Sequence, residues 1–325
     1  MLTIYLLQTL LPLALIAWIA FAPMRSHVGF WVQVFATTLS LYAVARLGLW
    51  LFPPWWTPIA LGALLVVAIP LGWVRRASER RHGYSRVTLV PTGRVGWVLL
   101  LGFLLIGLFV TSETRTALRG SRVPTVASVR LASPLGEGRY LIANGGGTVQ
   151  LNAHADALDQ SVTAHRVFHG TGYGVDLVAI DALGLRVGGI MPADPTRYRI
   201  FGMPVVAPCA GRIVRAVDGL PDMRVPEFDP GNLAGNHVIL RCGAADVVLA
   251  HFRRGSVMVR PGQAVAVGTP LAQVGNSGGS SEPHLHIHAQ RPGTDQAPLS
   301  GAPIPSLIEG RYLVRNDRFI VRGTP

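Results

Sequence analysis

The 325-residue sequence lacks lysine, has only two cysteines and has very few acidic residues in its first third. All 29 basic residues are therefore arginine, a bias of composition that indicates no mechanism. Neither Cys209 nor Cys242 belongs to a Cys-x-x-Cys pair, so the spacing excludes a cysteine zinc site. Residues 1–111 contain a single acidic residue, Glu79, and the lack of intramembrane carboxylates gives no support to a transport function.

The composition is too apolar for an ordinary soluble protein. Hydrophobic residues make up 50% of the chain and the mean hydropathy is +0.38. The net charge of +12 is uneven, because residues 1–111 hold eight arginines against one glutamate. A membrane protein whose basic residues flank its helices explains this charge more simply than nucleic-acid binding, so we expect no nucleic-acid partner.

Four apolar segments in the first third are long enough to cross a bilayer about 30 Å thick. They cover residues 2–21, 28–52, 55–74 and 95–111. We expect the first to be an uncleaved helix rather than a cleaved signal peptide, because it has no basic leading region, its apolar run is too long and further spans follow it. We therefore expect a four-span α-helical transmembrane region at residues 1–111, in contact with the lipid bilayer.

The loops set the expected orientation. Residues 75–94 form the most basic connection in the chain, which the positive-inside rule places in the cytoplasm. Both termini are then external, and the protein is a multi-pass protein of the cytoplasmic (inner) membrane with its second half on the external, periplasmic side. The helical region serves as an anchor in the simpler interpretation, and as a binding site for a membrane partner in the sharper one.

Residues 112–124 are polar without a sustained apolar period, which predicts a juxtamembrane linker. Beyond it, short β-rich runs separated by Gly, Pro and Asp predict an external all-β domain at residues 125–325, an antiparallel sandwich or barrel. The expected strands are residues 139–143, 173–180, 204–206, 212–217, 237–241, 247–252, 264–267, 271–274 and 284–290.

The two cysteines fall near the same end of one predicted strand pair. If residues 212–217 and 237–241 are antiparallel neighbours, Cys209 and Cys242 lie close together and could form a disulfide in an oxidising compartment. Two buried free thiols are the alternative.

Three histidines alternate with apolar residues in the run Pro-His-Leu-His-Ile-His at residues 283–288, which is typical of a strand with one imidazole face. Such a face is costly unless the rings bind a metal, transfer protons or meet water. His284 and His288 lie about 13 Å apart on an extended strand, so only adjacent pairs can share one ion. His286 belongs to both pairs.

Two further polar residues interrupt apolar strands. Asp176 lies within residues 173–180, where a buried carboxylate needs a cation or several donors. A metal would supply that cation, and a structural arginine or a backbone turn is the alternative. His251 ends the apolar run 247–250, and a lone histidine of this kind is more often structural than functional.

Taken in order, these pieces resemble the lysostaphin-like (LytM-type, duplicated hybrid motif) zinc metalloendopeptidases, which cleave peptide cross-bridges in peptidoglycan. The resemblance runs from about residue 145 to 290. Its pieces are Asp176, Pro-Val-Val-Ala-Pro-Cys-Ala-Gly at 204–211, Gly-Asn-His-Val at 235–238, Leu-Ala-His-Phe at 249–252, Gly-Asn-Ser-Gly at 275–278 and Pro-His-Leu-His at 283–286.

The resemblance implies one Zn²⁺ per chain with Asp176 and His286 as ligands. It implies that His251 and His284 act on the attacking water and the developing oxyanion, and it leaves His288 outside the ligand set. Two imidazoles and one carboxylate leave a position for water, which is the pattern of a catalytic zinc.

The first zinc ligand departs from the family pattern, because the position four residues before Asp176 is glycine. His154, His165 and His169 remain candidates. The glycine-rich lead-in at residues 145–147, followed by a strand-like run, favours His154, and residues 155–171 are then an insertion between ligands.

Two irregular segments, residues 183–202 and 219–236, are longer than hairpin loops and are expected to rim a substrate groove. Glu282 stands before Pro283 and is expected to cap a turn.

We expect a membrane-anchored zinc endopeptidase that hydrolyses peptidoglycan peptides. A non-catalytic module of the same fold, which binds the wall or activates another hydrolase, is the alternative. A cupin fits less well because Gln290 stands where its ligand glutamate would be, and a carbonic-anhydrase-like site fits less well because no histidine follows His288.

Overall fold

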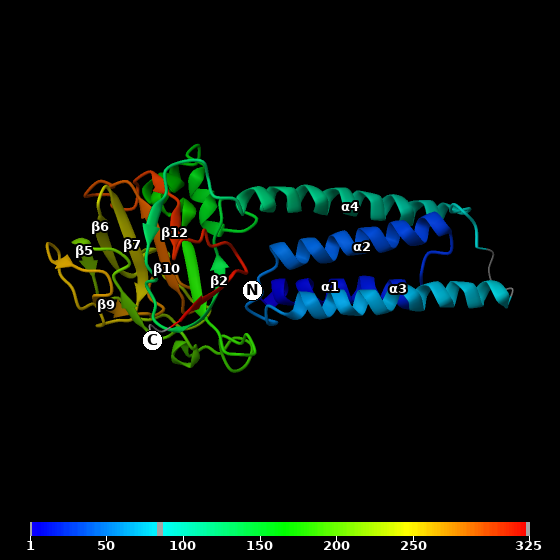
Figure 1. The fold of residues 1–325 in the computed structure, drawn as a ribbon, viewed down its shortest axis with the longest axis horizontal. Helices are drawn as coiled ribbons and strands as arrows, with labels where there is room; N and C mark the ends of the chain where they lie inside the picture. Colours follow the sequence, from blue (N-terminus) through cyan, green and yellow to red (C-terminus); the bar gives the residue numbers. More distant parts are fainter. Residues whose placement is uncertain (1, 83–86, 323–325) are drawn as a thin grey trace. The chain divides into compact units, whose positions relative to one another are not determined.

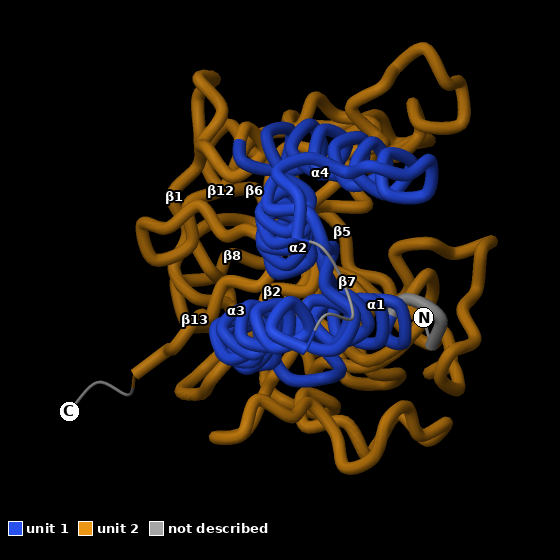
Figure 2. Tube along the Cα trace, turned by 90° about the vertical axis from the view of Figure 1, so that its right-hand side faces the viewer, with its two compact units in different colours: residues 1–118 blue, residues 119–325 orange. Residues whose placement is uncertain are grey.

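The computed structural model describes residues 2–82 and 87–322, and the chain divides into two compact units, Met1–Leu118 and Arg119–Pro325 (Figure 2). The first unit is helical and the second is rich in β-strands. This order of helices followed by a β-rich domain agrees with the prediction.

The described residues of the first unit form four helices: α1 (Leu2–Phe21), α2 (His27–Leu47), α3 (Thr57–Arg81) and α4 (Arg94–Gly120). In the described part of the chain, α2, α3 and α4 are long and apolar enough to cross a membrane. The apolar stretch of α1, Tyr5–Phe21, is shorter and spans only about 26 Å at roughly 1.5 Å per residue. The expectation of four spans is therefore corrected to three candidate spans.

At each end of the helical unit, a side chain of one helix donates hydrogen bonds to the loop that joins two others. Arg76 Nη2 of α3 donates to the carbonyl of Arg25, in the α1–α2 connection, at 3.0 Å. At the opposite end, Gln8 Nε2 of α1 donates to the carbonyls of Leu49 and Phe52 at 3.0 and 2.9 Å. The basic α3 terminus and the Arg25 loop therefore lie at the same end of the unit, as the predicted topology requires.

Helix α4 runs through most of the segment that we expected to be a linker. It ends at Gly120 rather than near residue 111. The polar residues after the apolar run are compatible with a helix, and the hydroxyls of Thr111 and Thr114 donate back to the carbonyls of Gly107 and Val110, both at 2.6 Å. A polar composition alone did not distinguish a helix from a linker here.

Each of the nine predicted strand runs contains a strand in the second unit. Four strands were not predicted, namely β1, β11, β12 and β13. The strands are β1 (Val129–Leu131), β2 (Gly138–Asn144), β3 (Val175–Ala179), β4 (Pro204–Val206), β5 (Gly211–Val217), β6 (Asn236–Cys242), β7 (Ala245–Phe252), β8 (Ala264–Val265), β9 (Pro270–Gln273), β10 (Leu285–Gln290), β11 (Pro303–Ile304), β12 (Ser306–Ile308) and β13 (Arg318–Val321).

A nine-stranded antiparallel sheet dominates this unit (Figure 1), in the order β13-β2-β3-β10-β7-β6-β5-β8, with β11 beside β10. One face carries the hydrophobic core, for example Leu177, Leu249 and Ile287, which packs with side chains from two small sheets. The β4–β9 sheet is antiparallel, whereas β1 and β12 are parallel, so the unit is not purely antiparallel. The residues between these core positions point to the opposite face.

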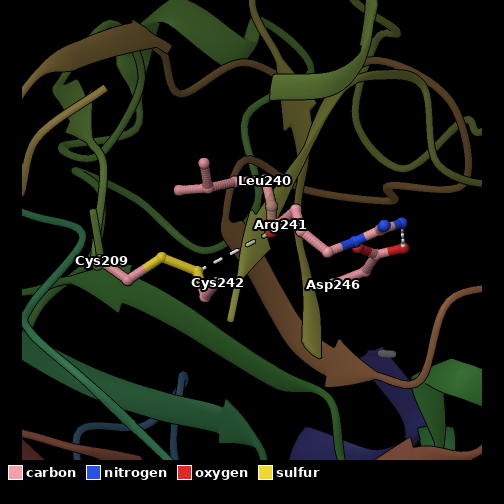
Figure 3. The surroundings of a disulfide bond; sticks show 5 residues. All are labelled: Cys209, Leu240, Arg241, Cys242 and Asp246. Atoms are coloured by element: carbon pink, nitrogen blue, oxygen red, sulfur yellow. Dashed lines mark hydrogen bonds and ion pairs between the residues drawn. A yellow bond between two sulfur atoms is a disulfide. The ribbon is translucent and has the colours of Figure 1, made fainter. Parts of the chain in front are cut away.

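A disulfide joins Cys209, just before β5, to Cys242, at the end of β6 (Figure 3). Strands β5 and β6 pair antiparallel with Arg212 opposite Arg241, which places both cysteines at one end of the ladder. Their Cα atoms are 6.0 Å apart, within the range of native disulfides. The predicted pairing of the cysteines is confirmed.

We predict that replacing both cysteines by serine lowers the free energy of unfolding of the second unit by about 3.5 kcal/mol, because the bond closes a loop between residues 33 apart and so restricts the unfolded chain. Pulse proteolysis of the full chain in urea and detergent measures this change. Each single substitution should cost about as much as the double one, and clearly additive losses would contradict a cross-link.

Candidate metal centre

The site begins with two side chains on adjacent central strands. Strands β3 and β10 pair antiparallel with Asp176 directly opposite His286. Their neighbours Leu177 and Ile287 point into the core, so both polar side chains point to the other face. His286 Nδ1 lies 2.8 Å from Asp176 Oδ1, and both residues are buried.

His154 completes a group of three. Its Nε2 lies 2.9 Å from Asp176 Oδ2. One ligand atom from each of His154, Asp176 and His286 lies within 4.8 Å of the others, which makes this a group that could hold a metal ion. His154 does not lie on the strand that we expected. It is in the 3₁₀ helix η1 (Ala153–Leu158), whose cap Asn152 accepts a hydrogen bond from the backbone N–H of His154 at 3.1 Å.

The other two candidates for the first ligand lie outside this group among the described residues. Both are in the 3₁₀ helix η2 (Thr163–Tyr173). His165 lines a cavity beside His154 and His286, but its Nδ1 contacts the carbonyl oxygen of Asp159 at 3.0 Å. His169 is half-buried, and burial lowers the pKa of its imidazole. The expected insertion at residues 155–171 is thus η1 and η2 with their connection.

Asp176 is held by donors as well as by histidines. Asn144 Nδ2 of β2 donates to Asp176 Oδ2 at 2.8 Å, and Arg315 Nη2 donates to Asn144 Oδ1 at 2.8 Å. Burial opposes ionisation of Asp176, but the charges of His154 and His284 and the hydrogen bond from His154 outweigh it and hold the pKa of the carboxyl well below its usual range. Burial lowers the pKa of His154, but the charge of Asp176 and the hydrogen bond to it outweigh burial and raise that pKa. Asp176 is therefore ionised at neutral pH.

The partners of β10 assign the proton positions on His286. Gln290 Nε2 donates to the Pro298 carbonyl at 2.7 Å, so Oε1 is the amide atom facing His288 Nε2 at 3.2 Å. An amide oxygen only accepts, so His288 Nε2 carries the proton and its Nδ1 accepts. His286 Nε2 lies 2.8 Å from that Nδ1 and must donate. Nδ1 of neutral His286 then carries no proton.

The imidazole rings of His286 and His288 are both neutral at pH 7. Burial first, and then the charge of His154, lower the pKa of His286 to about 4. Burial and the charge of His286 lower the pKa of His288 well below its usual range. The lone pair of His286 Nδ1 therefore faces the ionised Asp176 at 2.8 Å. Two acceptors at this distance are stable only with a cation beside them, so the donor set fits a bound metal ion.

His251 faces the same cavity because of a local distortion. Its φ is +65°, in the left-handed region that non-glycine residues rarely adopt. The pairing of β6 with β7 shifts register between Asn236 and Val238. This irregularity lets His251 line the cavity while the next residue, Phe252, enters the core. Nδ1 of His251 lies 2.9 Å from the carbonyl oxygen of Ser277 and donates to it.

His284 lies beside His251, with ring centroids 4.7 Å apart. Its Nδ1 lies 2.8 Å from the Glu282 carbonyl oxygen and donates to it, and its Nε2 is 3.6 Å from Asp176 Oδ1. Since each ring donates through Nδ1, Nε2 is the basic nitrogen in both. Burial, and then the charges of His284 and His286, lower the pKa of His251 well below its usual range, which keeps that ring neutral.

A cavity of about 360 Å³ is lined by His154, His251 and His286. Residues 219–236 contribute Leu233 and Ala234 to its wall, as expected of a groove rim. Residues 183–202 contribute no lining residue among those described, and η1 and η2 take that place, with His154, Ala157 and Phe168. The expected second rim is therefore corrected.

Residues 183–202 support the site from behind. Arg186 Nε and Nη2 donate to the two carboxylate oxygens of Glu282 at 2.6 and 2.8 Å, and both side chains are buried. The expectation that Glu282 caps a turn is wrong, because its carboxylate binds Arg186 instead. The Glu282 side chain anchors the loop that leads to His284 and β10.

Asn144, Arg186, Gln290 and Arg315 were not singled out from the sequence. Asn144, Arg186 and Arg315 each support the site through a partner far along the chain, and such a contact has no local pattern. Gln290 is a partial exception, because it continues the i, i+2 alternation of His286 and His288.

Part of the chain matches a known protein family. Residues 198–298 match the model of Peptidase family M23. This stretch contains His251, His284 and His286 and begins after His154 and Asp176. The chain therefore carries a Peptidase family M23 domain, and the resemblance to lysostaphin-like peptidases is confirmed.

Individual relatives cover parts of the chain. An uncharacterized metalloprotease of Haemophilus influenzae is 30% identical over 137 residues, which are 42% of this chain and only 26% of that protein. The catalytic domain of lysostaphin from Staphylococcus simulans is 23% identical, with a TM-score of 0.26, over 40% of this chain and 74% of its own. A putative peptidase M23 from Pseudomonas aeruginosa is 19% identical, with a TM-score of 0.28, over 59% of this chain and 60% of its own.

We predict that Gly174→Ala lowers the free energy of unfolding by about 1–3 kcal/mol, as overpacking does. A Cβ atom there would lie 2.6 Å from His286 Cε1 and 2.9 Å from the Thr171 carbonyl oxygen. Pulse proteolysis in urea measures the loss. Gly188→Ala is the matched control, because its Cβ would meet nothing within 4 Å. Equal effects of the two substitutions would show that the packing around His286 is loose.

Proposed function

We propose that this protein is a membrane-anchored zinc metalloendopeptidase that hydrolyses peptide cross-links of peptidoglycan. The observation that carries the proposal is the group of His154, Asp176 and His286, with donor atoms within 4.8 Å of one another. His284 lies beside it, 3.6 Å from Asp176, and His251 lies next to His284 and lines the same cavity as His154 and His286. A metal group alone would suit a structural site. Two further histidines with basic nitrogens suit proton transfer.

His154, Asp176 and His286 would hold the zinc ion. Zn²⁺ supplies a Lewis acid that polarises the scissile carbonyl and lowers the pKa of water towards about 7. His284, the closer of the two remaining rings to Asp176, accepts the proton of the attacking water through Nε2 and returns it to the leaving amine. His251 stabilises the negative charge that develops on the carbonyl oxygen. The carbonyl acceptors at Ser277 and Glu282 keep both rings in the orientation that this chemistry needs.

The substrate class rests on the family resemblance together with the placement of the domain. The apolar helices α2, α3 and α4 support insertion in the cytoplasmic membrane, and the basic C-terminal end of α3 supports a cytoplasmic location for that end. The second unit would then lie on the external or periplasmic side, where peptidoglycan is found. The Cys209–Cys242 disulfide suits that oxidising location.

The test is a pair of measurements on the full chain in detergent. We expect about one zinc per chain by elemental analysis, lost in Asp176→Ala. We expect His251→Ala and His284→Ala to keep the metal but to release muropeptide products at least about 100-fold more slowly, as loss of a general acid or base predicts. His169→Ala, which lies outside the metal group, is the control and should keep both properties.

Two outcomes would contradict the proposal. Full activity of both His251→Ala and His284→Ala would remove their assigned roles. Zinc without cleavage of any defined cross-linked muropeptide would indicate a module that binds the wall or activates another hydrolase.

The hydrogen bonds that link His286, His288 and Gln290 give a separate prediction. Without the acceptor at His288, His286 is free to protonate Nδ1 or to turn, so His288→Ala should weaken zinc binding by about 10- to 100-fold. Competition with a chromogenic chelator measures this affinity without any substrate. His288→Glu, which again offers an acceptor, should restore most of it.

His165→Ala is the control for this experiment, because His165 lines the cavity without joining the metal group. Unchanged affinity in His288→Ala would show that Asp176 alone orients His286.

A further inference from the structure

The basic end of the first unit contains a second cavity, of about 430 Å³. Three arginines of α3 or its last turn line it, together with His27 and Trp73; the arginines are Arg76, Arg80 and Arg81. Positions 73, 76 and 80 follow one face of a helix, so their side chains lie above one another along α3. The cavity therefore concentrates positive charge beside an aromatic ring.

Arg76 is the unusual member of this group, because only 4% of it is exposed. Nη2 donates to the Arg25 carbonyl at 3.0 Å, and the guanidinium lies 4.7 Å from the Phe30 ring centroid and 5.2 Å from that of Trp73. Nε is buried and has no hydrogen-bond partner within the described residues. A buried guanidinium with an unpaired donor is costly unless an acceptor reaches it.

Neither carboxylate of the first unit lines this cavity. Glu113 lies in α4, 19 residues beyond Arg94, where that helix begins, which is about 28 Å along the helix. Glu79 is the only acidic residue among residues 1–111, and it lies 3.8 Å from Arg75, on the exposed side of α3. Neither Arg75 nor Glu79 lines the cavity. Arg76, Arg80 and Arg81 thus form a positive site whose anion must come from outside this helical unit.

An apolar groove adjoins the cavity and indicates what kind of anion fits. It has a volume of about 450 Å³, and His27 borders both spaces. The remaining lining is apolar: Val28, Trp31, Val32, Phe35 and Leu89. Trp31 and Trp73 are in contact where the two spaces meet, with ring centroids 5.9 Å apart. A ligand with a negative headgroup and a hydrocarbon chain matches both.

We propose that this cavity binds the phosphate headgroup of an anionic phospholipid, with an acyl chain along the groove of α2. The phosphate oxygens accept hydrogen bonds from Arg76, in the geometry that guanidinium groups favour, and Arg80 and Arg81 supply the preference for negative charge. The site rests on the membrane placement in the proposed function and would fix the depth and rotation of the helical unit in one leaflet.

Native mass spectrometry of the delipidated full chain tests the site. We expect dioleoylphosphatidylglycerol to bind, and dioleoylphosphatidylcholine to bind at least about tenfold more weakly, because Arg80 and Arg81 repel the choline ammonium group that neutralises its phosphate. Arg76→Gln should lower the affinity for the anionic lipid by a similar factor. Arg75→Gln is the matched control, because it removes one neighbouring charge from the same helix outside the cavity, and it should change the affinity less than twofold.

The exposed pair Arg80→Gln/Arg81→Gln provides a second test that does not disturb the buried guanidinium. It should also weaken the anionic lipid selectively. Equal losses in Arg75→Gln and Arg76→Gln would show general charge attraction and overturn the site, as would equal binding of the two lipids. Displacement of the lipid by millimolar inorganic phosphate would identify a soluble anion as the ligand and overturn the lipid assignment.

Extraction of membranes with alkaline carbonate separates the two proposals. A chain that stays in the membrane but shows no preference for the anionic lipid contradicts this site alone. A chain released by carbonate contradicts the membrane anchor, and the lipid site falls with it.

Discussion

The pairing of β3 with β10 is the constraint on which the candidate metal centre depends. In this register Asp176 lies directly opposite His286, while Leu177 and Ile287 on the same strands enter the core. A slip by one residue would exchange the two faces and bury polar groups among aliphatic ones. The hydrophobic core therefore selects the register, and the register then places the carboxylate against the imidazole.

A buried carboxylate makes the surroundings of this pair as important as the pair itself. Asp176 accepts a hydrogen bond from Asn144, which is oriented by Arg315. Arg315 also donates to the carbonyls of Ala143 and Gln150, so the segment before β13 ties together the end of β2 and the approach to η1. On the other side, Gln290 and His288 fix the protons on His286. The side chains that orient Asp176 and His286 are therefore held in place by hydrogen bonds of their own.

The sequence predicted those parts of the site that have a local pattern. Alternation of polar and apolar residues located β3, β7 and β10, and the antiparallel pairing of β5 and β6 brought the cysteines together. Helix α4 was predicted too short, because polar residues that continue a helix resemble a linker in composition. His154 was favoured by its lead-in, but the 3₁₀ turn that carries it has no strand-like or helical period, so its local structure was not predicted.

The residues that hold the site from a distance could not be found in this way. The partner of Glu282 is Arg186, on a loop whose composition predicts only irregular structure, and the two meet because the fold brings them together. The orientation of His251 likewise depends on an irregularity in the pairing of β6 with β7, which alternation along β7 alone does not reveal. Alternation along the chain predicts which residues share one face of a strand. The side chains that hold the site residues in place come from distant segments, and only the tertiary structure shows them.

The two units satisfy a buried charge in different ways. In the second, Asp176 has hydrogen-bond donors and imidazoles of the same unit around it, so the chain itself prepares the place for a cation. In the first, Arg76 has a carbonyl and two aromatic rings, but the only carboxylate of residues 1–111 is beside Arg75. Cation–π contacts compensate only part of the cost of burying a guanidinium. An arginine placed between helices at the basic end of the unit is therefore best balanced by an anion from its surroundings, and in a membrane the phosphate of a lipid is the nearest one.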